Sequence, residues 1–366
     1  MNIIHVSSQN KWGGGEKQVL YLMMELAKKG VTQTLLCPKN SVLAMKSKEA
    51  GLKVLELNKS PFFVFTWGLK LNLLIKANKD LILHAHDAKA HNCVLTTAIL
   101  NPSTKIVIHR RLVKKASGAY QTFKFNHPAI RKIICISSAV RDSLEALVKD
   151  KSKLVLIPSG IRIENNSFQD QGSIKKGLGL QESSHLIVNI GSLLAQKRQL
   201  FFLEIAKAFF ERHPQKRDNT YFAILGEGPM RESLEEFISK NNLSKNCLML
   251  GFLKNAQDLL RASDMLISTS ADEALGNVIM ESFLAGVPVI ASQSGGVRDL
   301  IEDKETGFLA EDLDMESFLR PCELLLSDSA LRTKITTAAS RKLDNFDIAK
   351  TAESMYRIYL TIQAIP

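Results

Sequence analysis

Two glutamates and the loop between them are the residues of this sequence best suited to binding a charged sugar derivative. A helix is predicted to open, after a strand ending near Ser268, at Leu275, Gly276, Asn277 and Val278; Glu273 lies in the loop before it and Glu281 about one turn inside it. Free backbone amides and the helix dipole at such an N-terminus favour phosphate. Carboxylates beside it accept hydrogen bonds from sugar hydroxyls. The spacing therefore predicts a site for a nucleotide diphosphate sugar. The competing interpretation is that these acidic residues only stabilise the helix dipole.

The chain that positions these residues alternates short strands with amphipathic helices. A helix is predicted over 16–29, stopped by Gly30. The stretch 163–184 is polar and contains glycine, so it is predicted to be a linker. Alternating strands and helices build parallel sheets with covered faces, and 366 residues suggest about two domains. We expect two doubly wound α/β domains, with strands at 2–6, 33–37, 52–57, 81–85, 105–109, 132–136, 153–157, 185–190, 220–225, 247–250, 264–268 and 287–291.

Glycines and basic residues follow several of these strands. In doubly wound sheets, ligands bind beyond the carboxyl ends of the strands. Gly13, Gly14 and Gly15 follow the first strand, and His109 ends a later one. For Gly226–Gly228, which follow 220–225, plain turn chemistry is the preferred interpretation. Two such sets of strand ends predict two domains facing each other across a cleft.

Charge is distributed unevenly along the chain. The net charge is +11, but residues 1–165 hold 26 Lys and Arg against 10 Asp and Glu, whereas 166–366 hold 22 against 27. A basic first half favours polyanions, such as nucleic acid, an anionic membrane surface or a phosphorylated substrate. No apolar run is long enough to span a membrane, and the N-terminus is interpreted as a strand and not a signal peptide. Five scattered cysteines fit a reducing cytosol.

The motifs, in their order along the chain, resemble those of retaining family 4 glycosyltransferases of the GT-B fold, of the bacterial lipopolysaccharide and polysaccharide type. Glu273-x7-Glu281, with LGN between and FLAGVPVIASQSGGVRDLI after, is similar to the donor-site signature of that family. The resemblance covers nearly the whole chain. The other matching segments are Gly13-Gly14 with Glu16, LILHAH at 81–86, KIVIH at 105–109, ICISSAVRDSL at 134–144, LIPSGI at 156–161, GSLLAQK at 191–197 and LGEGPMRESLE at 225–235.

The resemblance implies roles for several site residues of the second domain. Lys197 would neutralise the donor diphosphate, and Glu281 would bind the nucleotide ribose. Glu273, with the backbone at Gly276 and Asn277, would hold the donor sugar and phosphates. Where the family usually has arginine the chain has Ser192, so that one cation is absent. Arg198, beside Lys197, is the residue expected to replace it.

For the first domain, the resemblance implies that Gly13 to Gly15 pack against the diphosphate from the other side of the cleft. His109 would face the reacting sugar, so the catalytic set is His109, Lys197 and Glu273. The donor would be a UDP-, GDP- or ADP-linked hexose-type sugar, transferred with retention of configuration. In that mechanism the leaving phosphate takes the proton of the acceptor. No metal and no other cofactor is implied.

Two features resemble metal sites, but neither is predicted to bind a metal ion. Asp312-Leu313-Asp314 has DxD spacing, but it lies in an acidic run and is predicted to start a helix. His84 and His86 are expected to point to opposite faces of their strand, which would prevent joint chelation. The sequence therefore predicts no metal site.

The acceptor is expected to be a glycan or a lipid-linked sugar, in cell-envelope polysaccharide or lipopolysaccharide synthesis. Residues 61–68 (PFFVFTWG) are aromatic and lie near Lys59 and Lys70. Such a cluster suits the interface of an anionic bilayer, and packing in the core is an equally good interpretation. The protein is thus expected in the cytoplasm, with peripheral contact to the inner face of the membrane as a hypothesis.

The expected division is a first, acceptor-binding domain at 1–165, a second, donor-binding domain at 166–346 and a C-terminal helix at 347–366. That helix either crosses back to the first domain or stays on the second. Three other functions compete with glycosyl transfer. A nicotinamide-dependent enzyme is disfavoured because the chain lacks the G-x-G-x-x-G loop of such enzymes. A nucleotide-sugar epimerase on the same fold is disfavoured by the order of the motifs. A non-enzymatic polyanion-binding protein is disfavoured because the chain has no nucleic-acid-binding motif, so no nucleic acid is expected as a partner.

Overall fold

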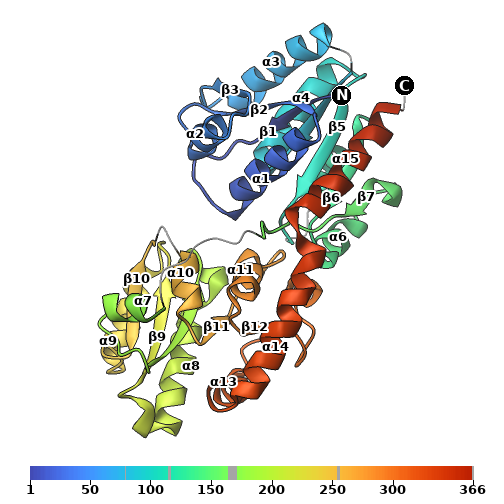
Figure 1. The fold of residues 1–366 in the computed structure, drawn as a ribbon. Helices are drawn as coiled ribbons and strands as arrows, with labels where there is room; N and C mark the ends of the chain where they lie inside the picture. Colours follow the sequence, from blue (N-terminus) through green and yellow to red (C-terminus); the bar gives the residue numbers. More distant parts are fainter. Residues whose placement is uncertain (79, 114–116, 164–170, 254–255, 365–366) are drawn as a thin grey trace. The chain divides into compact units, whose positions relative to one another are not determined.

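The computed structural model describes residues 1–78, 80–113, 117–163, 171–253 and 256–364 (Figure 1). The chain forms two compact units. One contains Met1–Arg162 and Phe346–Pro366, and the other contains Ile163–Asn345. Each unit is built on its own parallel sheet, which confirms the expected fold class of two Rossmann-like domains.

The first unit contains a seven-stranded sheet in the order β3-β2-β1-β4-β5-β6-β7. The order reverses between β1 and β4, and the crevice outside such a switch point is where doubly wound sheets bind ligands. The register places His5 of β1 opposite His84 of β4. The strands are β1 (Asn2–Val6), β2 (Thr32–Pro38), β3 (Val54–Leu57), β4 (Leu81–Ala85), β5 (Lys105–Arg110), β6 (Ile130–Cys135) and β7 (Leu154–Leu156).

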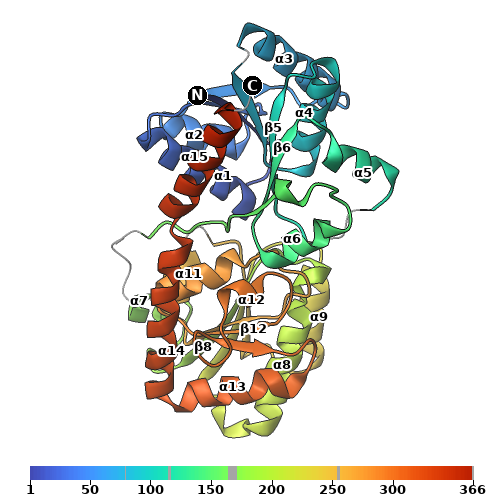
Figure 2. The ribbon, with the colours of Figure 1, turned by 90° about the vertical axis from the view of Figure 1, so that its right-hand side faces the viewer.

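Helices cover both faces of this sheet, and one of them comes from the far end of the chain. The last helix, α15 (Ile348–Ala364), packs against α1 (Gly14–Lys28), as Figure 2 shows. Met355 and Tyr359 of α15 share a buried core with Leu22 and Leu26 of α1. The other helices are α2 (Val42–Glu49), α3 (Phe63–Ala77), α4 (Ala88–Leu100), α5 (Ala119–Asn126), α6 (Ser138–Glu145) and the 3-10 turn η1 (Lys151–Lys153).

A close backbone approach fixes where α15 begins. A Cβ atom at Gly160 would lie 2.4 Å from the Cα atom of Ile348, so only glycine fits. The amide of Ile161 also donates to the carbonyl of Phe346, and that of Ile348 to the carbonyl of Ile161. The last helix therefore belongs to the packing of the first unit.

The second unit contains a six-stranded sheet in the order β10-β9-β8-β11-β12-β13. Its switch point lies between β8 and β11, the strands that precede the predicted diphosphate and sugar residues. The strands are β8 (His185–Ile190), β9 (Thr220–Leu225), β10 (Cys247–Gly251), β11 (Met265–Ser268), β12 (Val289–Ser292) and β13 (Phe308–Ala310).

The helices of the second unit bury an aromatic core against this sheet. Phe202, Phe209 and Phe210 of α8 each pack edge-to-face on Phe222 of β9, at ring-centroid distances of 5.6–5.7 Å. The helices are α7 (Gln171–Gly177), α8 (Gln199–Arg212), α9 (Arg231–Lys240), α10 (Ala256–Arg261), α11 (Asn277–Ala285), α12 (Val297–Leu300), α13 (Met315–Ser327) and α14 (Ser329–Lys342), with 3-10 turns η2 (Ala195–Lys197), η3 (Pro214–Lys216) and η4 (Leu343–Phe346).

The observed elements differ from the expected ones at two places. The stretch 163–184, predicted to be a linker, contains α7; residues 164–170 lie outside the described part. Strand β13 was not predicted, because three residues give too short a pattern to recognise. All five cysteines are buried and free. None of the helices in the described ranges is long and apolar enough to cross a bilayer.

Candidate functional site

An ion pair joins the loops that follow β8 and β11 in the second unit. Nζ of Lys197 lies 2.5 Å from Oε2 of Glu273, and both side chains are mostly buried. The carboxyl ends of parallel strands meet at one edge of the sheet, so residues distant in sequence converge there. The structure therefore brings together Lys197 and Glu273, two of the three predicted catalytic residues.

Backbone contacts hold the loop that carries Lys197. Oγ1 of Thr269, just after β11, lies 3.0 Å from the carbonyl oxygens of both Lys197 and Arg198. The amide of Ala271 donates to the carbonyl of Gln196 over 2.8 Å. Arg198 itself is left-handed, with a φ of 52°, at the turn into α8. The backbone of the loop that carries Lys197 is thus held by the residues that follow β11, before Glu273.

Gly226 and Gly228 are packing requirements and not only turn residues, which corrects the sequence interpretation. A Cβ atom at Gly226, whose φ is +143°, would lie 1.9 Å from the carbonyl oxygen of Gly191. One at Gly228 would lie 2.4 Å from the carbonyl oxygen of Leu193. The backbone of the loop after β9 therefore packs directly against the backbone of the loop 191–198.

The N-terminus of α11 has the geometry of an anion site. Gly276 precedes the helix with a φ of +110°, and no side chain in the described chain caps this N-terminus. Its neighbour Leu275 is buried, whereas Asn277 and Val278 are half-buried. Backbone amides of the first helical turn lack intrahelical acceptors and attract anions.

The two glutamates lie on either side of this N-terminus along the chain, and both are half-buried. Glu281 lies one turn inside α11 and is half-buried. The carbonyl of Glu273 accepts from the amide of Gly296, which ties its loop to the loop after β12. The loops after β8, β11 and β12 thus form one connected surface at the switch point.

Arg198 and Ser192 differ from what the family pattern suggests. The guanidinium of Arg198 forms an ion pair with Asp312, so it is already engaged by an acid of this chain. Ser192 is exposed and its carbonyl accepts from the amide of Leu194. Asp314 caps α13 by accepting from the amide of Ser317, which confirms the helix-start interpretation of the DxD spacing.

In the first unit, the glycine loop leads into α1. Gly13 is the N-cap residue, with extended backbone, and Gly14 opens the helix; both are exposed, and Gly15 is half-buried. Glu16 lies in the first turn, and burial raises the pKa of its carboxyl. Small exposed residues here leave the amide end of α1 accessible to a ligand.

His109, the third predicted catalytic residue, ends β5 inside a cluster of histidines. Its ring centroid lies 5.4 Å from that of His84 and 5.8 Å from that of His86. Both of its ring nitrogens are buried without a hydrogen-bond partner among the described residues. The side chain also lines a cavity of about 340 Å³ in the first unit.

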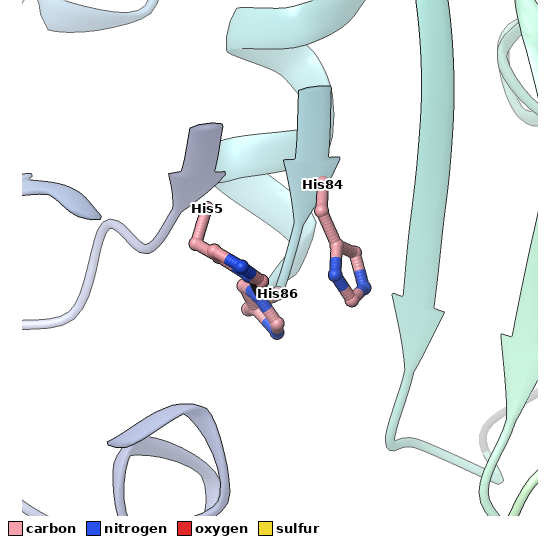
Figure 3. A group of neighbouring side chains, drawn as sticks. All are labelled: His5, His84 and His86. Atoms are coloured by element: carbon pink, nitrogen blue, oxygen red, sulfur yellow. Dashed lines mark hydrogen bonds between the residues drawn. The ribbon is translucent and has the colours of Figure 1, made fainter. Parts of the chain in front are cut away.

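The expectation that His84 and His86 point to opposite faces was wrong. Residues two apart in a strand share a face, and these ring centroids are only 4.0 Å apart. Figure 3 shows their rings gathered with that of His5 from the neighbouring strand. Nδ1 of His5 lies 2.9 Å from Nε2 of His86. Strand register therefore assembles the cluster.

Arg111 sets the protonation pattern of these rings. It donates to the carbonyl of His86 over 2.9 Å and contacts Nδ1 of that ring at 3.4 Å. A guanidinium can only donate, so this Nδ1 is the acceptor of a neutral ring, and Nε2 donates to His5. Burial lowers the pKa of His5 to about 3 and keeps the pKa values of His84 and His109 well below the usual range.

Three imidazoles could in principle hold a metal ion. His5, His84 and His86 each offer a ligand atom, and these atoms lie within 4.8 Å of one another. Both nitrogens of His86, however, are engaged by Arg111 and His5. An ion would have to replace these hydrogen bonds beside a guanidinium. We therefore interpret the trio as a hydrogen-bonded network.

Sequence reasoning missed two members of this network, Arg111 and Tyr359. Burial lowers the pKa of Arg111 to about 10, while the charges of Glu16 and Asp87 favour its protonated form. The hydroxyl of Tyr359, in α15, lies 2.6 Å from Nδ1 of His84. The arginine directly follows His109-Arg110 in the sequence.

The comparisons with known proteins agree with this architecture. A model described as Glycosyltransferase Family 4 matches residues 12–165, and one described as Glycosyl transferases group 1 matches residues 170–342. The chain is 26% identical to the Escherichia coli UDP-Gal:alpha-D-GlcNAc-diphosphoundecaprenol alpha-1,3-galactosyltransferase, over 80% of this chain and 78% of that protein. It is 32% identical to the Rhizobium meliloti lipopolysaccharide core biosynthesis glycosyltransferase LpsE, over 31% of this chain and 34% of that protein.

A solved structure shares the fold over the full length. The crystal structure of Anabaena Alr3699/HepE in complex with UDP-glucose has a TM-score of 0.86 and 17% identity, covering 99% of this chain and 100% of that one. Two parallel Rossmann-like sheets, each with polar groups at its switch point, define the GT-B class of fold. Together the two family models match most of the sequence, and the chain belongs to the GT-B glycosyltransferases of family 4.

Proposed function

We propose that this protein transfers a hexose-type sugar from a nucleotide diphosphate sugar to a glycan or lipid-linked acceptor, with retention of configuration. One observation carries the proposal: Lys197 and Glu273 meet at the switch point of the second sheet, in the same connected set of loops as the N-terminus of α11. A cation, free amides and a carboxylate suit the phosphates and hydroxyls of such a donor. The UDP-glucose complex of the related fold supports this class of ligand.

Each donor-site residue has a role in this proposal. Lys197 and the amides at Gly276, Asn277 and Val278 bind the diphosphate and stabilise the negative charge that develops as the sugar–phosphate bond breaks. The donor phosphate first replaces Glu273 as the ion-pair partner of Lys197. The carboxylate of Glu273 then accepts hydrogen bonds from hydroxyls of the transferred sugar. Glu281 accepts from the ribose hydroxyls. Leu275 keeps the loop anchored in the core, where it is buried.

Arg198 and Ser192 are secondary in this proposal. Arg198 contributes to diphosphate binding only by leaving Asp312, with which it forms an ion pair. Ser192, exposed on the same loop, offers a hydroxyl but no charge. The diphosphate therefore depends chiefly on Lys197.

The first unit contributes acceptor binding and the groups that face the reacting sugar. Gly13, Gly14 and Gly15 allow the donor phosphates to approach the backbone, and His109 contacts the sugar. The leaving phosphate takes the proton of the attacking hydroxyl, so the reaction needs no metal ion and no second carboxylate. An NMR determination of the anomeric configuration of the product tests retention.

The acceptor in this proposal is membrane-associated. The Escherichia coli relative is named for a diphosphoundecaprenol acceptor and the Rhizobium relative for lipopolysaccharide core synthesis. For this chain we propose a role in the cell envelope, at the inner face of the cytoplasmic membrane. The basic first half is consistent with an anionic surface there.

One face of α3 is suited to that contact. The aromatic cluster 61–68 is divided: Phe63 and Trp67 are buried, whereas Phe62 and Phe65 are 77% and 55% exposed. Exposed apolar residues continue along the helix at Leu69 and Leu73, spaced as one helical face. The only ionisable residues between 59 and 78 are lysines. An apolar stripe bordered by lysines binds an anionic bilayer.

Vesicle sedimentation tests this face. The chain should bind phosphatidylglycerol vesicles more than phosphatidylcholine vesicles, less so at high salt, because basic residues add about 1 kcal/mol each near such a surface. Phe65→Ser should weaken binding, while Leu324→Ser, which removes an exposed apolar side chain from α13, should not. Binding that ignores lipid charge and salt contradicts the proposal.

A thermal-shift screen over nucleotide sugars tests the donor. A donor at a hundredfold excess over its Kd stabilises the folded protein by about 2.7 kcal/mol. Lys197→Ala and Glu281→Ala should each reduce the shift by half or more; an unchanged shift in both would exclude this site. Incubation with labelled donor separates sugar transfer from epimerisation by the product formed.

A further inference from the structure

A cavity of about 340 Å³ is lined by His109 and by residues that have no role in the proposed donor site. It lies in the first unit, between the end of β5, the beginning of α4 and α5. Basic side chains line much of it: His91, His109, Arg110 and Lys124. Its volume is at the lower end of the range of small-molecule sites.

Lys124 places a buried positive charge in this wall. Lys124 is only 4% exposed. Its Nζ donates to the carbonyl of Ala88 over 3.0 Å and to Oδ1 of Asn92 over 2.5 Å. These acceptors are neutral. No carboxylate of the described chain forms an ion pair with Lys124. Burial, together with the charge of Arg110, lowers its pKa to about 8.

Asp87, the only acid among the described residues of the lining, is engaged elsewhere. One of its oxygens accepts from the amides of Lys89 and Ala90 and from the hydroxyl of Ser8. The other accepts from the amide of Ser8 over 2.6 Å. Its charge therefore stabilises the N-terminus of α4 and the loop after β1, and the balance of the cavity remains positive.

His109 supplies an independent indication of a missing partner. It is 5% exposed, and both ring nitrogens lack hydrogen-bond partners among the described residues. Buried polar atoms without partners are uncommon and call for a ligand, water or ion. Because the ring lines the cavity, a molecule bound there is in position to satisfy it.

We propose that this cavity binds a phosphate group carried by the acceptor. Lys124 and Arg110 would neutralise its charge, and the N–H of His109 would donate to one of its oxygens. Lysine and arginine can only donate, and phosphate offers acceptor oxygens, so the two are complementary. Two cations favour a phosphate over a singly charged carboxylate. This proposal rests on the proposed function only in assigning the bound molecule to the acceptor.

Binding of phenyl phosphate to the full chain tests the pocket. The titration contains saturating UDP, so that the second unit is already occupied, and benzoate and phenol are the comparison ligands. Phenyl phosphate should bind at least tenfold more tightly than either. Benzoate binding equally well would overturn the choice of phosphate.

Variants locate the binding. Lys124→Met should weaken phenyl phosphate binding at least tenfold, and Lys124→Arg should retain most of it. Arg110→Gln gives a second measurement should Lys124→Met fold poorly. Lys89→Met is the matched control, because this lysine is exposed nearby on α4 and does not line the cavity. Equal Kd values for the chain and for both neutral variants would overturn the pocket.

A vesicle arm distinguishes the source of the phosphate. If Lys124→Met also weakens binding to phosphatidate vesicles relative to phosphatidylcholine vesicles, the pocket reaches lipid-borne phosphate. If Lys124→Met weakens binding of the soluble ester alone, the ligand of the pocket is a free phosphorylated sugar. Either result supports phosphate binding in the pocket. Failure of the proposed function is seen separately, as absence of nucleotide-sugar binding with the phosphate ester still bound.

Discussion

Nζ of Lys197 lies 2.5 Å from Oε2 of Glu273, although 76 residues separate them in the chain. Their side chains are 25% and 16% exposed, so each partly desolvated charge needs a partner. In the proposed reaction a donor phosphate replaces Glu273 beside Lys197. The carboxylate is then available to the sugar hydroxyls, and donor binding exchanges one charge pair for another.

Replacing Lys197 by methionine should weaken donor binding, and it should also lower the free energy of unfolding, because the partly buried carboxylate of Glu273 loses its partner. Because hydrogen bonds to charged groups contribute about 1.5–3 kcal/mol, the Kd should rise roughly tenfold to a hundredfold. Calorimetry with the donor selected by thermal shift measures it. Lys207→Met is the control, since Lys207 pairs with Glu211 on the exposed side of α8. A Kd within twofold of that of the unmodified chain would exclude a diphosphate role.

Gly226→Ala should destabilise the second unit strongly. The new Cβ atom would lie 1.9 Å from the carbonyl oxygen of Gly191, at a φ of +143°, so one loop must move. We expect a loss of roughly 3 kcal/mol or more in the free energy of unfolding. Gly179→Ala has a left-handed φ of +74° but open space around it, and should cost only about 1–2 kcal/mol. Similar urea midpoints for the two variants would contradict this packing argument.

The arrangement of the proposed donor site was largely predictable because its signals are local. Short windows of sequence show each of them: the helix that begins after Gly276, Glu281 one turn inside that helix, and Lys197 soon after the end of β8. Parallel-sheet topology then brings Lys197 to Glu273. The side-chain partner of Arg198 was not predictable, because Asp312 is 114 residues away and the contact depends on loop conformation.

The network around His109 was predictable only in part. His84 and His86 share a face by strand geometry alone, so careful use of the period of two would have placed them together. His5 joins them through the pairing of β1 with β4. Tyr359 joins from a helix 275 residues beyond His84. The apolar face of that helix fits either unit, so sequence periodicity could not choose between them.

Tyr359→Phe should destabilise the first unit while keeping the packing of the ring. The change removes the hydroxyl that lies 2.6 Å from Nδ1 of His84 and leaves this buried nitrogen without that partner. Such a loss typically costs about 1–3 kcal/mol. Tyr356→Phe, on a half-buried residue of the same helix, should change the free energy of unfolding little. Urea denaturation compares the two, and equal stabilities would remove Tyr359 from the network.

The stability of the first unit should fall as the pH drops below about 6.5. Burial lowers the pKa of His5 to about 3 and holds the pKa values of His84, His86 and His109 well below their usual range. In the unfolded chain these rings titrate near pH 6.5, so below that pH the unfolded state binds more protons and gains stability relative to the folded state.

Above pH 6.5 this contribution to stability is fully present. Below it, each histidine that stays neutral in the folded state reduces the free energy of unfolding by up to about 1.4 kcal/mol per pH unit. Urea denaturation at pH values from 7 to 4.5 measures the slope, and His5→Gln should reduce it by about one proton. A stability that does not change between pH 6.5 and 4.5, or the same slope in His5→Gln as in the unmodified chain, would show that the buried rings are protonated in the folded protein.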